Sequence, residues 1–463
     1  MNSIKYLTGF VLLLLLTPSC NKNLNVAPQN ALTVSQIQTS SDVEALLFGA
    51  YSGLQAPGDF GESFLFAPDL IASDSQVNFV GTFYDYLAVQ NKITVATNAM
   101  VGNIWTSAYS TINIANTVLD KIALVDSTDR PTVQGEAYFI RGTVYFYLLG
   151  LFGKPYSDGN ASSNLGVPIV LTPTYTYDSS ANSPNKPARA TVTQTYAQII
   201  ADLQTGISLL PTSNINFRAD VYSAHAMLSR VYLSMEQYAN AAAQADTVLG
   251  SGNFSLTSTY DKAFNTDGNS TEDIFGIQQS LQSNAGTTNN GIVTFYLPYS
   301  VNGNQTGGRG DAQIDTSYFD IFEPADFRGT YVTAGTSISG YSGFYPNKWG
   351  AFYKTIPVIR LAEMYLTRGE GNIVAGTNIG NDPLDDINTI RTRAGASTLT
   401  TVGQTDFIEE RFRELGFEGD RFWSLKRVKW SISGLDYDNN LLILPIPQSE
   451  IDVNKNLVQN TGY

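Results

Sequence analysis

Two amphipathic helical patterns follow one another between Phe217 and Gly250, and they restrict the fold more than any other feature of the sequence. The first carries apolar residues at helical spacing and the second is rich in alanine, with the polar stretch SMEQY at the turn. The positions concerned are Val221, Ala224, Leu228, Val231 and Met235, then Tyr238, Ala241, Ala245 and Val248. Each helix can bury its apolar stripe only against another helix, and alanine lets two helices approach closely. The segment therefore predicts a helical hairpin.

Helical periodicity of the same kind recurs along the chain. Apolar faces appear over residues 43–54, 105–122, 133–151, 196–210 and 359–373. Hairpins of about 34 residues that stack on their neighbours are typical of tetratricopeptide repeats. We therefore expect a mainly α protein, a tetratricopeptide-like helical-hairpin stack, although other all-helical packings fit the periodicity too. In a further helix near the C-terminus, Asp382 is expected at the N-cap, Pro383 at the first position and Gly395 just after the end.

Two long stretches without helical periodicity interrupt these helices. Gly153 to Ala190 carries five prolines, and Ser251 to Asn347 is rich in Gly, Asn, Thr and Tyr. Long irregular connections in compact proteins are usually either functional or disordered, and tyrosine-rich segments are poor candidates for disorder. We expect these loop insertions to form the working surface. The organisation predicted is an N-terminal helical region over residues 41–250 and a C-terminal region with the long insertion over residues 251–463.

The N-terminus has the layout of a secretory signal. It reads MNSIKYLTGFVLLLLLTPSC, with Lys5 before an apolar run and small residues before the only cysteine, Cys20. The apolar run is too short to span a bilayer as a helix of about 20 residues. We predict a signal peptide over residues 1–19, lipidation of Cys20 and a tether over residues 20–40; ordinary cleavage that leaves a free thiol is the alternative. Several acyl chains on one residue would attach the protein stably to a membrane.

Charge and residue scarcity exclude several classes of function. The chain has 27 Lys and Arg against 41 Asp and Glu, so its field would repel the phosphates of a nucleic acid. One histidine and one cysteine make a two-histidine zinc motif and an intramolecular disulfide impossible. Neither a nucleophile elbow, a P-loop nor a dinucleotide fingerprint is present. We expect no cofactor, no metal site and no nucleic-acid partner.

The most charged stretch is ERFRELGFEGDRFWSLKR, residues 410–427, in a chain whose charged fraction is 15%. Helical spacing allows Glu409 and Glu410 to pair with Arg413, and Arg411 to pair with Glu414. We interpret the stretch as architecture, in which local ion pairs satisfy the charges. After a break at two glycines, Phe422, Trp423 and Leu425 are expected in a core. A catalytic role for Glu414 or Glu418 is the alternative.

Several segments resemble the SusD/RagB family in order along the chain. Towards the C-terminus they are PVIRLAEMYLTRGE, INTIRTRAG, ERFRELGFEGDRFWSLKR and LLILPIPQSEIDVNKNLVQNTGY; upstream they include WTSAYSTINIANTVLDKI and GEAYFIRGTVYFYLLGLFGKPY. The resemblance implies a mostly helical SusD-like fold with four tetratricopeptide-like units. It also implies a non-enzymatic outer-membrane lipoprotein that faces the cell exterior and captures oligosaccharides or other nutrients for a SusC-like TonB-dependent transporter. Trp105, Trp423 and Trp430 lie in matched segments and are expected in the core.

Candidate ligand contacts come from the tyrosine-rich loops, because sugar sites combine aromatic platforms with hydrogen-bonding side chains. The family's glycan contacts come from two corresponding regions, and the likeness is regional rather than residue by residue. The first region offers Asn78, Phe79, Phe83, Tyr84, Asp85 and Tyr86, and the second offers Tyr296, Tyr299, Asn302, Arg309, Tyr341, Tyr345 and Trp349. For each residue, packing of the loop against the protein body is the alternative to ligand contact.

Two other functions stay open at the level of sequence. A surface glycan hydrolase would use a pair of loop-borne Asp or Glu residues, and any two of the 41 acids could converge in the fold. A helical scaffold that gates the transporter or binds peptide would have no affinity for glycans.

Overall fold

The computed structural model describes residues 34–176, 186–215 and 217–463. The predicted signal peptide, Cys20 and the first part of the tether lie outside these residues. Among the described residues, no helix is both long enough and apolar enough to cross a bilayer.

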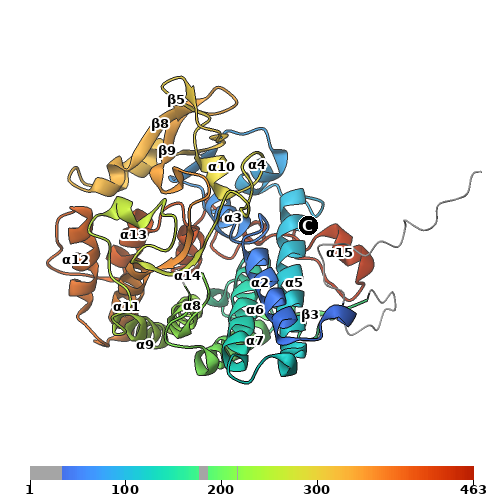
Figure 1. Ribbon diagram of the computed structural model, residues 1–463. Coiled ribbons are helices and arrows are strands. Elements are labelled where there is room, and N and C mark those ends of the chain that lie inside the picture. Colours follow the sequence, from blue (N-terminus) through green and yellow to red (C-terminus); the bar gives the residue numbers. More distant parts are fainter. Residues whose placement is uncertain (1–33, 177–185, 216) are drawn as a thin grey trace, which may run out of the picture.

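Helices dominate the structure and pack in pairs (Figure 1). The pairs are α2 (Ser40–Leu54) with α5 (Ala99–Asp120), α6 (Arg130–Phe152) with α7 (Val192–Leu209), α8 (Val221–Ser234) with α9 (Tyr238–Leu249), and α11 (Leu361–Ala375) with α12 (Pro383–Ala394). Successive pairs contact each other through α5 and α6, α7 and α8, and α9 and α11. The prediction of a mainly α stack of helical hairpins is confirmed.

Local capping explains where these helices begin and end. The Thr39 side chain accepts a hydrogen bond from the Asp42 N–H at the start of α2, and Thr191 does the same for Gln194 at the start of α7. The predicted boundaries of α12 are confirmed, because Asp382 caps its first turn and Gly395 ends it at φ +76°. Such caps satisfy N–H and C=O groups that have no partner within the helix.

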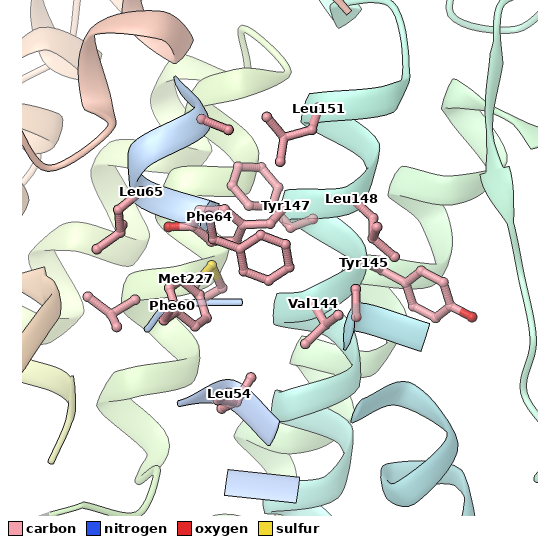
Figure 2. Packing of buried hydrophobic residues seen from close by; sticks show 14 of the residues in the cluster. Leu54, Phe60, Phe64, Leu65, Val144, Tyr145, Tyr147, Leu148, Leu151 and Met227 are labelled. Carbon is pink, nitrogen blue, oxygen red and sulfur yellow. The ribbon is translucent and has the colours of Figure 1, made fainter. Parts of the chain in front are cut away.

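The hydrophobic core is continuous between the helices and is partly aromatic. Figure 2 shows Phe60 and Phe64 packed against Tyr147 of α6, with ring centroids 4.7 and 4.9 Å from that of the tyrosine. All three rings are buried. The same cluster runs from Ile37 to Leu457, so residues on both sides of the predicted boundary at 250 share one core.

The long insertion is more regular than the sequence suggested. It contains a four-stranded antiparallel sheet in the order β6-β5-β8-β9, which lies beyond the helical stack at the top of Figure 1. The strands are β5 (Ser300–Val301), β6 (Asn304–Gln305), β8 (Val332–Thr336) and β9 (Ser342–Pro346). The expectation of an irregular segment was wrong here, because strands of two to five residues are too short to show an alternating pattern.

Three two-stranded sheets connect segments that are distant in sequence. They pair β1 (Val77–Phe79) with β7 (Ala312–Ile314), β2 (Leu165–Pro168) with β3 (Arg189–Thr191), and β4 (Asp273–Ile277) with β10 (Ile356–Arg360). The predicted helix from Ile359 was wrong at its start. Ile359 belongs to strand β10, and the helix begins at Leu361. The remaining α-helices of the described residues are α3 (Ser63–Ile71), α4 (Tyr84–Gln90), α10 (Ile292–Tyr296), α13 (Gln404–Glu414), α14 (Asp420–Arg427) and α15 (Gln448–Val453).

The charged stretch is architectural, but its ion pairs are mostly not local. Glu409 and Glu410 each lie 3.2 Å from Arg413, as predicted. The predicted pair between Arg411 and Glu414 is wrong, because Arg411 binds Asp420 of α14 instead. Since Glu414 faces the interior rather than solvent, its partners come from other elements.

Three arginines converge on the buried carboxylate of Glu414. Arg328 and Arg360 approach to 3.2 Å each, and Arg393 also pairs with it. Arg360 additionally binds Glu418 at 2.8 Å. Burial raises the pKa of a carboxyl, but the three guanidinium groups outweigh burial and hold the pKa of Glu414 well below its usual range.

The expectations for the tryptophans hold only in part. Trp105 is buried, and Trp423 is half-buried and stacks on Phe146 with centroids 5.3 Å apart. Trp430 was expected in the core but is 38% exposed. Lys429, which directly precedes Trp430, has a φ of +60°, and the Trp430 ring meets that of Phe412 in a T-shaped arrangement with centroids 6.4 Å apart.

Candidate ligand-binding site

Strands β1 and β7 bring together the two regions that the sequence proposed as ligand-binding. Asn78 pairs with Gln313 and Phe79 with Ala312 in an antiparallel ladder. The ladder continues with a 2.7 Å hydrogen bond from the Val80 N–H to the carbonyl of Asp311. Two segments more than 200 residues apart in sequence therefore form one continuous surface. In Figure 1, α4 and α10 lie beneath the four-stranded sheet on this side of the molecule.

Arg309 links the two segments through its guanidinium group. That group lies 4.6 Å from the centroid of the Phe83 ring, which is within the range of a cation–π contact. Its Nε donates to Asp311 at 2.6 Å, and its Nη1 donates to Asn289 at 3.4 Å. Arg309 is thus held beside an aromatic ring, and 14% of its side chain remains exposed.

Tyr86 supports this surface from below. Its hydroxyl donates to Glu62 at 2.6 Å, and the same carboxylate accepts the Gly291 N–H at 2.7 Å. The ring packs against Phe295 with centroids 4.8 Å apart. Burial raises the pKa of Glu62 to about 7, while the hydrogen bonds act in the opposite direction. Because its hydroxyl is occupied and its ring is packed, Tyr86 positions the loop.

Four of the proposed ligand residues are buried. The exposed fractions are 3% for Phe79, 0% for Tyr296, 1% for Tyr345 and 2% for Trp349. Tyr296 donates its hydroxyl to Asp69 at 2.8 Å, and the indole N–H of Trp349 donates to the carbonyl of Phe417 at 3.0 Å. Burial leaves Phe79 and Tyr296 no surface to offer a ligand, so these two rings act as packing beneath the site.

Other proposed residues are open to solvent. Tyr84 is 64% exposed and Tyr341 is 58% exposed, and both point away from the core. Asn78 is exposed on β1, and Asn302 is exposed in the turn between β5 and β6. Phe83, Asp85 and Tyr299 are half-buried. Exposed tyrosines with amide side chains in the same two regions supply the ring faces and hydrogen-bonding groups that a sugar needs.

A hollow of about 330 Å³ lies along the four-stranded sheet. Tyr345, Trp349 and Phe352 contribute ring surface, and Thr306, Thr333 and Asn347 contribute polar groups. The Thr333 hydroxyl donates to the Asn347 side-chain oxygen at 2.5 Å, which orients that amide. Tyr345 and Trp349 are almost fully buried, so they contribute little of the surface that a ligand in the hollow would meet. Its size is at the lower end for a small-ligand pocket.

Two family profiles match the chain. One, described as "Starch-binding associating with outer membrane", matches residues 22–233, and the other, described as "SusD family", matches residues 221–440. The chain belongs to the SusD/RagB family.

Relatives of this SusD/RagB chain cover most of its length. SusD-like protein P2 of Formosa agariphila is 25% identical over 534 residues, which span 99% of this chain and 100% of the relative. Starch-binding protein SusD of Bacteroides thetaiotaomicron is 25% identical over 431 residues, 73% of this chain and 74% of the relative. A putative sugar binding protein of Bacteroides vulgatus has a similar structure, with a TM-score of 0.80 and 25% identity over 92% of this chain and 99% of that chain. The SusD-like fold predicted from the sequence is confirmed.

Some residues that line the hollow of this SusD/RagB chain carry little or no signal in the sequence. Phe352, Thr333 and Asn347 line the hollow but were not singled out. Phe352 carries a recognisable signal, since it lies in the same aromatic run as Trp349. Thr333 carries none, because only the pairing of β8 with β9 places it beside Asn347.

The alternative of catalysis at Glu414 or Glu418 finds no support in this geometry. Both carboxylates are occupied by arginine or lysine partners, and Glu414 is fully buried. Among the described residues, no group of three or more His, Cys, Asp or Glu side chains could hold a metal ion.

Proposed function

We propose that this protein is a cell-surface lipoprotein of the outer membrane that binds a neutral, polar oligosaccharide and passes it to a SusC-like TonB-dependent transporter. The β1–β7 ladder carries the proposal, because it joins two loop regions that expose tyrosines and amides beside a ring-lined hollow. Flat ring faces accept the C–H faces of sugars, and amide groups hydrogen-bond their hydroxyls.

The relatives support the same class of ligand. One is named a starch-binding protein and another a putative sugar binding protein. One of the matched profiles also describes association with the outer membrane. Attachment to that membrane through acyl chains on Cys20 and delivery to a transporter are parts of the proposal that follow from the family resemblance and the N-terminal sequence.

Calorimetric titration with a panel of neutral oligosaccharides tests the binding step. Tyr84→Ala and Tyr341→Ala should each weaken binding about fivefold to a hundredfold, since stacking of one ring contributes roughly 1–3 kcal/mol. The thermal midpoint should stay unchanged because both side chains are more than half exposed. Ile93→Ala, a similarly exposed residue outside the two loop regions, serves as the control. Wild-type affinity in both tyrosine variants would place the ligand elsewhere.

Two further measurements address the anchor and the alternative functions. Cys20→Ser should move the protein from the membrane to the soluble fraction, and continued membrane fractionation would argue against acylation. Chromatography of the oligosaccharide after incubation with purified protein should return it intact; shortened products would indicate a hydrolase. Peptide binding without any glycan affinity would indicate the scaffold alternative.

A further inference from the structure

A second and larger hollow, of about 940 Å³, lies at the other end of the β1–β7 ladder from Phe83 and Arg309. Its wall includes Ser75, just before β1, and Ser317, just after β7. The opposite wall is formed by α13, α14 and the segment that follows α14. The residues that carry the inference are Arg421, Lys429 and Trp430.

Arg421 brings a guanidinium group without an anionic partner to this hollow. Its Nε is buried and has no hydrogen-bond partner, and no carboxylate of the described part of the chain forms an ion pair with it. The guanidinium carbon lies 4.4 Å from the centroid of the Phe412 ring. By contrast, Arg413 binds Glu409 and Glu410, and Arg427 binds Glu370.

A largely buried guanidinium group without an ion-pair partner is energetically unfavourable until an anion binds to it. Burial lowers the pKa of Arg421, with weaker compensation from Tyr318, Asp74 and Asp69. Neither acid forms an ion pair with Arg421 in the described residues, and both accept hydrogen bonds from hydroxyl groups: Asp74 from Ser433 at 2.7 Å, and Asp69 from Tyr296. The position is therefore suited to a negatively charged group from outside the protein.

The lining of the hollow carries one more positive than negative side chain, because Arg413, Arg421 and Lys429 stand against Asp320 and Glu409. Lys429 is exposed at its wall, and Trp430 is 38% exposed. Of the two acids in this lining, Glu409 forms an ion pair with Arg413. Asp320 forms no ion pair with the described residues. Such a local excess of positive charge contrasts with the net charge of −14 for the whole chain.

We propose that this hollow binds a saccharide unit that carries a carboxylate or a sulfate, with the anionic group on Arg421 and the sugar ring against Trp430. A guanidinium group binds such oxygen pairs through two parallel hydrogen bonds. The indole face suits the apolar side of a sugar ring. This hollow is separate from the neutral-glycan site, because its residues lie at the other end of the β1–β7 ladder.

The test is calorimetric titration of the purified protein with trigalacturonate, a sulfated trisaccharide, a neutral trisaccharide and hexaglutamate, each at low and high NaCl. We expect one or both anionic sugars to bind, with an affinity that falls as salt rises. Arg421→Met should weaken this binding roughly tenfold to a hundredfold, since hydrogen bonds to a charged group contribute that much. Trp430→Ala and Lys429→Met should also weaken it, whereas Lys455→Met, at a lysine outside the hollow whose side chain is 72% exposed, should not.

Several outcomes would overturn the inference. These are equal affinity for hexaglutamate, equal affinity for the neutral trisaccharide, or unchanged binding in the Arg421 and Trp430 variants. If Arg421→Met lowers the thermal midpoint, the Lys429→Met and Trp430→Ala variants test the proposal instead, because both of these residues are exposed. Tyr84→Ala separates the two sites, because it should leave the binding of trigalacturonate intact. Failure of all neutral glycans to bind would count against the proposed function alone.

Discussion

Replacing Glu414 with Gln tests whether the buried ion pairs hold the C-terminal half of the fold together. The carboxylate is fully buried and lies within 3.2 Å of both Arg328 and Arg360, and Arg393 also binds it. Gln keeps the size of the side chain but removes the charge, which leaves three guanidinium groups with fewer anions. Breaking a buried ion pair costs about 3–5 kcal/mol. Because Gln still accepts a hydrogen bond, we expect a loss of about 3 kcal/mol in the free energy of unfolding.

The same helix offers a matched control in Glu409→Gln. Glu409 makes one ion pair, with Arg413, and its side chain is 51% exposed. Solvent screens such pairs, so we expect this variant to lose about 0.5 kcal/mol or less. Urea unfolding at pH 7, followed by circular dichroism, measures both changes. Equal urea midpoints for the two variants would refute the view that Glu414 organises a stabilising network.

The effect of Glu414 should also depend on pH. Its folded pKa lies below the ordinary value of about 4.3, so the folded protein binds fewer protons at this group than the unfolded chain does. The stabilisation is therefore complete above the unfolded pKa and is lost as the pH falls through the folded pKa. The difference between wild type and Glu414→Gln should shrink progressively below about pH 4. A constant difference down to pH 2 would contradict the assignment.

Three further predictions concern other parts of the molecule. Gly150→Ala should lower the thermal midpoint, because its methyl group would meet the ring of Trp423 at 1.7 Å and overpacking costs about 1–3 kcal/mol; an unchanged midpoint would mean that the ring moves aside freely. Burial raises the pKa of Asp59 to about 8, so wild-type stability should fall as the pH rises from 4 to 8, and Asp59→Asn should flatten that slope in urea unfolding. Asn78→Ala, at an exposed position of β1, should weaken neutral-glycan binding in calorimetry while the thermal midpoint stays the same.

The helical stack could be predicted because its determinants are local. An apolar stripe, a cap and a breaker all lie within one or two dozen residues, as in α12 with Asp382, Pro383 and Gly395. The sheet in the insertion has no such determinants. Strands β5 and β6 are two residues long each, and β5 meets β8 only after about thirty intervening residues. Their existence depends on pairing that a local pattern does not show.

The candidate site could be located by region but not by residue. Tyr84 begins α4 and Tyr296 ends α10, and each follows a phenylalanine, yet one is 64% exposed and the other is fully buried. The difference lies in tertiary contacts, because Asp69 of α3 accepts the Tyr296 hydroxyl and fixes that ring inside. A sequence can show that rings are available in a loop, but the rest of the fold decides which of them remain free for a ligand.

The charged stretch illustrates how burial changes the rule for pairing charges. On the exposed side of α13, Glu409 pairs with Arg413 at helical spacing as expected. On the buried side, Glu414 must find partners in other elements, because water is absent there. Two hydrogen bonds connect the charged stretch to the candidate site. The Lys348 Nζ donates to the Glu414 carbonyl at 2.8 Å, and the next residue, Trp349, donates to the Phe417 carbonyl. The charged stretch thus holds the residues that follow β9, including Trp349 in the lining of the hollow. A substitution at Glu414 that loosens α13 should therefore weaken glycan binding, although Glu414 does not touch the ligand.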